Sequence, residues 1–159
     1  MRRLLSCVLA LGLLAGCASA PRTPVDALLG PWSGRLALQV QDNASQSFSA
    51  AFELKGTARE GELALFDPLG NTVALMTWLP DSATLTTNGE TRQFRSVNSL
   101  VASATGSALP VAALFDWLRG IDTPVTGWQA DLSQLAQGRL SAQRLQPPPL
   151  AELRLVLER

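Results

Sequence analysis

Segments in which apolar and polar residues alternate are the feature that most constrains the fold. Residues 34–41 read GRLALQVQ, and the same alternation recurs in residues 47–55 and 151–159. Successive side chains of a strand point to opposite faces, so a period of two gives one buried face and one wet face. The pattern therefore predicts half-buried antiparallel strands over most of the chain.

Two further segments, residues 62–66 and 72–79, are apolar at odd and even positions alike. Such a strand lies in the centre of a sheet, or one of its faces meets something other than water. In the second segment we expect Val73 and Leu75 to face inward. Asn88-Gly89 follows shortly after and is a strong signal for a two-residue hairpin turn.

Two helices are predicted between the strands. Residues 96–106 carry apolar side chains at helical spacing after a capping Ser96, and residues 109–120 do so between Pro110 and Gly120. Strand patterns resume after the second helix. We therefore expect an α+β chain, mainly β, with one antiparallel sheet and the helices on its concave face.

The composition excludes several classes of function. The chain has no histidine and a formal net charge of zero. Histidine is the usual general base and a common metal ligand, and nucleic-acid binding needs a basic face. The spacing of the carboxylates marks no catalytic pair. We therefore predict no catalytic residue, no metal site, no cofactor and no nucleic-acid partner.

The first residues have the organisation of an export signal. Arg2 and Arg3 precede an apolar run, residues 4–14, that is too short to span a bilayer as a permanent helix. The run ends in LLAGC, which resembles the lipobox of a bacterial lipoprotein, in which the cysteine is acylated and becomes the first mature residue. The alternative is an ordinary secretory signal cleaved at Ala18–Ala20.

These observations divide the chain into three parts. We predict a lipoprotein signal peptide in residues 1–16, a tether in residues 17–31 that is lipidated at Cys17, and a single domain in residues 32–159. The residue after the cysteine is Ala18 rather than aspartate. By resemblance to known sorting signals, this predicts lipid anchoring in the outer membrane of a Gram-negative cell, on the side that faces the periplasm.

A predicted hairpin turn at residues 67–70 carries an unusual side chain. Asp67-Pro68-Leu69-Gly70 has the residues of a tight turn, yet the third position is a large apolar residue. If Leu69 points outward, it can enter a bilayer. Otherwise it folds back onto the sheet or is simply exposed, as single surface leucines often are.

The order of the motifs resembles the outer-membrane lipoprotein receptor family LolB. The lipobox comes first, then W-x-G-R-L at residues 32–36, then the D-P-L-G turn, then G-x-x-L-P-x-x-x-L-x-x-W-L-x-G at residues 106–120. The resemblance extends from Cys17 to about Trp128 and is looser in the C-terminal strands.

The resemblance implies a half-open β-barrel-like sheet, with helices closing an apolar cavity that accepts acyl chains. It implies a monomer that receives acylated lipoproteins from the periplasmic carrier LolA and delivers them into the inner leaflet of the outer membrane without a nucleotide. It also implies a membrane-insertion loop formed by Pro68, Leu69 and Gly70.

The cavity candidates are apolar residues of the predicted strands and of the second helix. They are Leu36, Leu38, Val40, Phe48, Phe52, Leu63, Leu65, Val73, Leu75, Val111, Leu114, Phe115 and Leu118. The same residues would also make a closed core, and a shift of one residue reverses the faces of a strand.

The region after the second helix is shorter than is usual in this family, because only residues 121–127 precede Trp128. A shortened member would have a smaller sheet and a shallower cavity. The main alternative function is therefore an outer-membrane lipoprotein of the same fold that moves no cargo and instead binds another lipid or scaffolds the envelope. A soluble LolA-type carrier is a third possibility, against which the lipobox argues.

Overall fold

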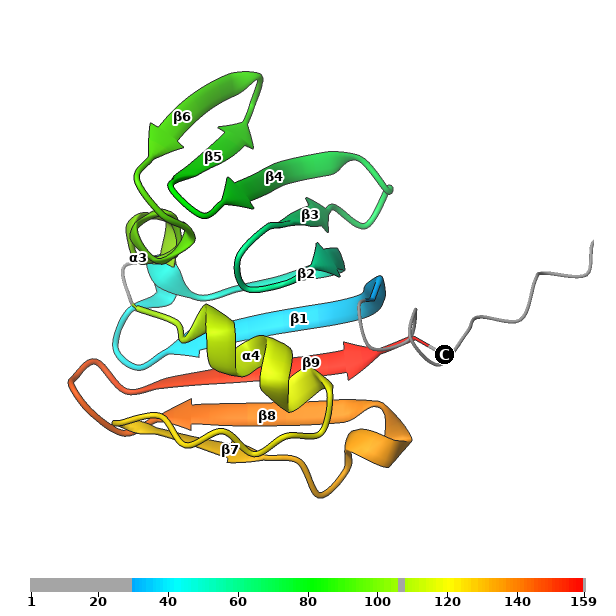
Figure 1. Ribbon diagram of the computed structural model, residues 1–159, viewed down its shortest axis with the longest axis vertical. Helices are drawn as coiled ribbons and strands as arrows, with labels where there is room; N and C mark the ends of the chain where they lie inside the picture. Colours follow the sequence, from blue (N-terminus) through cyan, green and yellow to red (C-terminus); the bar gives the residue numbers. More distant parts are fainter. Residues whose placement is uncertain (1–29, 106–107, 159) are drawn as a thin grey trace, which may run out of the picture.

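A single nine-stranded antiparallel sheet forms the body of the computed structural model, which describes residues 30–105 and 108–158 (Figure 1). Its order is β6-β5-β4-β3-β2-β1-β9-β8-β7. The two outermost strands, β6 and β7, are not paired with each other, so the sheet is open. The strands are β1 (Trp32–Val40), β2 (Phe48–Gly56), β3 (Gly61–Phe66), β4 (Thr72–Leu79), β5 (Ser82–Thr87), β6 (Glu90–Phe94), β7 (Trp128–Asp131), β8 (Arg139–Arg144) and β9 (Ala151–Leu157).

The central strands have the faces that alternation predicts. Every second residue of β1 from Trp32 to Val40 is buried, and the intervening side chains are exposed or half-buried. Leu36 pairs with Leu155 and Leu38 with Leu153 across the β1–β9 ladder. Because directly paired residues share a face of the sheet, these leucines form a continuous apolar surface at its centre.

Within the described part of the chain, two helices cover one face of this sheet. They are α3 (Val97–Thr105) and α4 (Val111–Leu118), and both lie on the same side in Figure 1. α3 begins after Ser96, whose Oγ accepts a hydrogen bond from the backbone N–H of Ser99 at 3.2 Å, as an N-cap does. Two short 3-10 turns, η2 (Ala44–Gln46) and η3 (Leu135–Gln137), lie in loops. The expected mainly-β α+β architecture is confirmed.

The C-terminus of α4 ends in a Schellman motif. The N–H of Gly120 donates to the carbonyl of Trp117, and the N–H of Ile121 donates to that of Asp116, both at 2.9 Å. Gly120 has φ +80°, a conformation that residues with a Cβ rarely adopt. The predicted helix stop at this glycine is confirmed.

The predicted faces of β4 are wrong. Ala74, Met76 and Trp78 are buried, whereas Val73 is 44% exposed and Leu75 lies on the same outer face. β3 fixes this register, because its inward Leu63 and Leu65 pair with Met76 and Ala74. A bulge then shifts the ladder by one residue after Leu65, and such a shift moves side chains to the opposite face.

The predicted signal peptide, residues 1–16, lies outside the described residues, as do Cys17 and the tether up to residue 29. Among the residues that the structure describes, no helix is long and apolar enough to cross a membrane.

Candidate functional site

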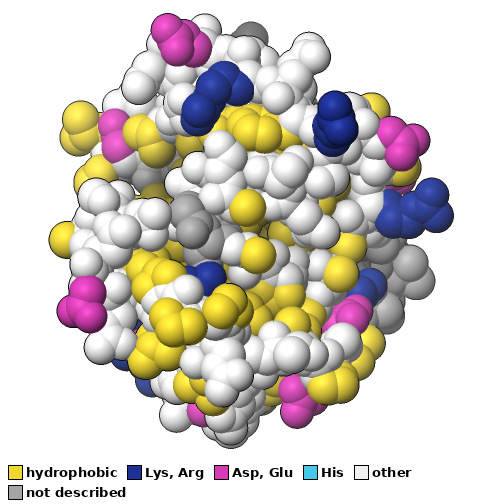
Figure 2. Space-filling view, turned by 90° about the vertical axis from the view of Figure 1, so that its left-hand side faces the viewer, with side chains coloured by type: hydrophobic (Ala, Val, Ile, Leu, Met, Phe, Trp, Pro, Cys, Tyr) yellow, Lys and Arg dark blue, Asp and Glu magenta, His cyan; other side chains and the backbone are white. Residues whose placement is uncertain are grey.

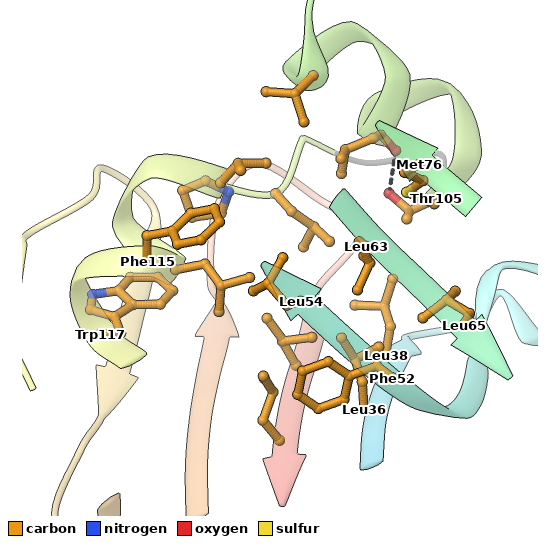
Figure 3. Close-up of a pocket in the computed structure, with 18 of the residues that line it drawn as sticks. Leu36, Leu38, Phe52, Leu54, Leu63, Leu65, Met76, Thr105, Phe115 and Trp117 are labelled. Carbon is orange, nitrogen blue, oxygen red and sulfur yellow. Dashed lines mark hydrogen bonds between the residues drawn. The ribbon is translucent and has the colours of Figure 1, made fainter. Parts of the chain in front are cut away.

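An apolar cavity of about 70 Å³ lies between the concave face of the sheet and the two helices (Figure 3). None of the described residues that line it carries a charged side chain. Its walls come from β1 to β4, β9, α3, α4 and the segment before α4. The lining residues are Leu36, Leu38, Phe48, Phe52, Leu54, Leu63, Leu65, Met76, Trp78, Val97, Val101, Thr105, Leu109, Pro110, Val111, Leu114, Phe115, Trp117, Leu153 and Leu155.

The few polar side-chain atoms of these residues are bonded to the backbone. Thr105 Oγ1 donates to the carbonyl of Val101 at 2.8 Å. The Nε1–H groups of Trp78 and Trp117 donate to the carbonyls of Thr57 and Thr123, at 3.0 and 3.1 Å. A polar ligand group would be costly to bury against these apolar walls. The cavity therefore suits a hydrocarbon ligand.

The volume of the cavity limits what it can hold in this conformation. A cavity for one water molecule needs roughly 10–15 Å³, so 70 Å³ accommodates several small groups but only part of a long acyl chain. A complete chain requires the covering helices to move outward from the sheet.

The way α4 is held permits such a movement. Its polar side chains bond within the helix and to the loop after it: Arg119 Nη2 lies 2.7 Å from Asp116 Oδ1, and Thr123 Oγ1 donates to Asp116 Oδ2 at 2.8 Å. The helix faces the sheet through apolar side chains such as Phe115. Apolar contacts are non-directional, so they can readjust while the polar bonds move with the helix.

The hairpin between β3 and β4 presents Leu69 at its tip with 88% of the residue exposed. Asp67 Oδ1 accepts hydrogen bonds from the N–H groups of Leu69 and Asn71 at 2.8 and 2.9 Å, and Oδ2 accepts one from Asn71 Nδ2 at 2.9 Å. These bonds lower the pKa of Asp67, and the bond from the Asn71 side chain has the largest effect. The turn therefore holds Leu69 outward on a fixed backbone.

The tip stands at the same end of the sheet as one end of the cavity. Phe66, the last residue of β3, pairs with Ala51 near the start of β2, where the cavity-lining Phe48 is 36% exposed. In Figure 1 the β3–β4 connection lies at the right-hand side, away from both helices. An exposed apolar residue and an apolar cavity are thus close neighbours in the fold.

Comparison with known proteins identifies a family with which this chain shares sequence similarity. The family model described as "Outer membrane lipoprotein LolB" matches residues 31–147. The chain belongs to the LolB family. It is 38% identical over 135 residues to the outer-membrane lipoprotein LolB of Bordetella petrii. This alignment covers 80% of this chain and 66% of that protein.

Further LolB proteins give the same result. The LolB of Ralstonia nicotianae is 36% identical, in an alignment that covers 82% of this chain and 66% of that protein. The LolB of Cupriavidus pinatubonensis is 38% identical, in an alignment that covers 88% of this chain and 70% of that protein. The chain therefore spans about two thirds of the length of the first two of these LolB relatives.

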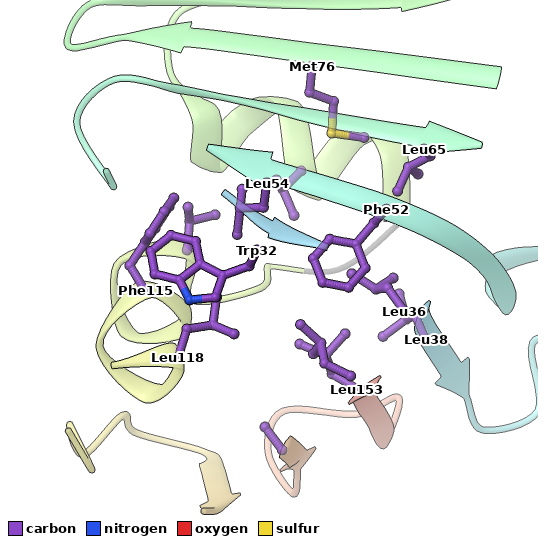
Figure 4. Close-up of a cluster of buried hydrophobic side chains, with 14 of the residues drawn as sticks. Trp32, Leu36, Leu38, Phe52, Leu54, Leu65, Met76, Phe115, Leu118 and Leu153 are labelled. Atoms are coloured by element: carbon purple, nitrogen blue, oxygen red, sulfur yellow. The ribbon is translucent and has the colours of Figure 1, made fainter. Parts of the chain in front are cut away.

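Most of the cavity residues predicted from the sequence line the cavity of this LolB-family chain, and four do not. Val73 and Leu75 lie on the outer face of β4. Val40 is buried on the inner face but lines a separate groove with Gln41 and Leu150, because the end of β1 extends past the cavity. Leu118 is buried beyond Phe115 and near Trp32 (Figure 4).

Several lining residues were not predicted. Leu54, Leu153 and Leu155 lie on the inward face of strands whose alternation was recognised, so continuing the pattern along β2 and β9 would have found them. Met76 and Trp78 were missed because the faces of β4 were exchanged. The helical spacing of α3 was recognised, but it gave no indication that residues of α3 or of the segment before α4 line the cavity, because the position of a helix over a sheet is a tertiary property.

Proposed function

We propose that this chain is an outer-membrane lipoprotein receptor, which accepts acylated lipoproteins from the periplasmic carrier LolA and inserts them into the outer membrane. The observation that carries the proposal is the wholly apolar cavity in a member of the LolB family. Cargo acyl chains are the ligands that such walls favour, since each buried methylene contributes about 0.8 kcal/mol.

The transfer needs no nucleotide if affinities increase along the route. The receptor binds acyl chains more tightly than the carrier does, and the bilayer holds them more tightly still. A cavity that recognises cargo through apolar area alone suits this sequence of exchanges, because release leaves no polar group of the cavity unpaired. The proposed partners are therefore the carrier, the acylated cargo and the inner leaflet of the outer membrane.

Acylation of Cys17 would anchor the receptor beside the membrane that it serves. A single acyl chain gives only marginal membrane binding, whereas two or three give stable anchoring. The exposed Leu69 would add roughly 1.5–3 kcal/mol when buried in lipid, which is too little to anchor a protein. It is enough to orient the hairpin end of an anchored domain toward the bilayer.

Depletion of the chain in its host tests this proposal. If it is the receptor, a reporter outer-membrane lipoprotein accumulates in the periplasm bound to the carrier, and a plasmid copy of the chain restores its delivery. Delivery that continues without carrier-bound cargo would contradict the proposal and favour a lipoprotein of this fold that moves no cargo.

A further inference from the structure

The ring of Phe115 packs against two tryptophans at one end of the cavity, and Figure 4 shows it beside one of them, Trp32. Its centroid lies 5.7 Å from that of Trp32 and 6.2 Å from that of Trp78, with interplanar angles of 69° and 62°. These are edge-to-face arrangements, which aromatic rings favour. Phe115 is 1% exposed, so the ring is packed closely within these contacts.

The backbone around it fixes the ring of Trp78. Trp78 donates from Nε1 to the carbonyl of Thr57, and its ring passes so close to Gly61 that a Cβ there would lie 2.5 Å from Cζ2. Trp32 contacts the ring of Phe115, is buried, and does not line the cavity. The aromatic cluster of Trp32, Trp78 and Phe115 therefore closes this end of the cavity.

The opposite end of the cavity is apolar and partly open. Phe48 and Leu65 line it, and Phe48 is 36% exposed. Figure 3 shows Phe115 at one side of the cavity and Leu65 at the other. The lining residues of β2 run from Phe48 to Leu54, which at about 3.3 Å per residue is roughly 20 Å of strand, a distance comparable with a long acyl chain.

We propose that Phe115 is a specificity-determining residue that limits the length of the acyl chain the cavity accepts. The proposal rests on the proposed function, since it assumes an acyl ligand. The chain would enter beside Phe48 with its methyl end leading, and its polar head would stay in water near the β3–β4 hairpin. The reverse orientation would bury the head against the aromatic cluster, where the indole N–H of Trp78 is already bonded.

The test is a series of saturated fatty acids that compete with the fluorescent cis-parinaric acid for the full chain carrying Cys17→Ser, which cannot be acylated. From lauric to arachidic acid, affinity should rise about tenfold for each added pair of methylenes until the chain reaches Phe115, and then level off. We call the acid at which the affinity stops rising the break. Phe115→Ala should move this break to longer acids by at least one member of the series.

Phe94→Ala is the matched control, because Phe94 packs against the core but does not line the cavity, and its break should stay at the wild-type acid. Circular dichroism verifies folding. If Phe115→Ala does not fold, Phe115→Leu keeps an apolar body at the site and should shift the break in the same direction.

Three results would overturn the proposal, and those that refute only the length limit are distinguishable from the one that refutes acyl binding. A folded Phe115 variant with the wild-type break, or a Phe94→Ala shift of equal size, would refute the length limit while leaving acyl binding intact. Failure of every acid to displace the probe from the wild-type chain would refute the acyl-binding cavity itself, and with it the proposed function.

Discussion

The contacts of Leu69 within the fold do not explain why this position carries a leucine. It is 88% exposed, and its side chain is not needed to form the turn, which Asp67 and Asn71 hold through their hydrogen bonds. A polar residue would serve the fold equally well at this position. Its apolar character therefore favours a role outside the folded domain, at a lipid surface.

Leu69→Glu tests that role at a single residue. A charge at the tip would have to be dehydrated to enter the bilayer, so we expect cargo to be accepted from the carrier while its insertion into liposomes falls at least tenfold. Leu79→Glu is the matched control, since Leu79 is 58% exposed at the opposite end of β4. Equal insertion by the Leu69 variant and the wild type would remove Leu69 from the mechanism.

The turn that holds Leu69 should respond to acid through Asp67. Hydrogen bonds from Asn71 and from backbone N–H groups lower its pKa, so the folded state favours the ionised carboxylate. This stabilisation is complete above the unfolded value, near 3.9, and is lost as the pH falls through the lower folded value. The melting temperature of the wild type should therefore exceed that of Asp67→Asn at neutral pH and converge with it in strong acid. A gap of constant size at all pH values would contradict this explanation.

At the scale of the element, β4 is a strand whose inward face cannot be predicted from its own sequence. Its residues are apolar at odd and even positions, so alternation could not choose the inward face, and the choice came from pairing with Leu63 and Leu65 of β3. The strands with one polar face, β1 and β9, were predicted with the correct orientation because water distinguishes their faces. The same limit hid the aromatic cluster, because Trp32, Trp78 and Phe115 are far apart in sequence and meet only when α4 packs on the sheet.

The corrected face of β4 can be tested by truncating one residue on each side. Met76→Ala removes side-chain atoms from the buried face, at an expected cost of about 2 kcal/mol or more in the free energy of unfolding. Val73→Ala changes an exposed position and should cost about 0.5 kcal/mol or less. Urea denaturation of both variants measures the difference. A larger loss for Val73→Ala would restore the face expected from the sequence.

At the scale of the whole molecule, the sheet and the helices differ in how they are held. β1 is paired on both edges, with β2 and with β9, whereas α4 rests on apolar contacts and keeps its polar bonds to itself and its own loop. A sheet built in this way is a fixed wall, and α4, apart from the ring contacts of Phe115 with the two tryptophans, is the element that can yield when an acyl chain larger than the 70 Å³ void enters. The sequence predicted both layers, but the volume between them depends on side-chain packing that no periodicity encodes.

Amide hydrogen exchange should reveal this division. In the full chain carrying Cys17→Ser, we expect the amides of α4 to exchange faster than those of β1 and β9, because few directional bonds oppose a local opening of the helix. Palmitic acid that enters between α4 and the sheet should slow exchange in α4, since ligand binding stabilises the state that it occupies, and leave the central strands unchanged. Protection that rises equally in β1, β9 and α4 would mean that the fatty acid stabilises the domain as one unit. In that case α4 would have no separate movement, and the cavity would have to admit acyl chains by a general loosening of the core.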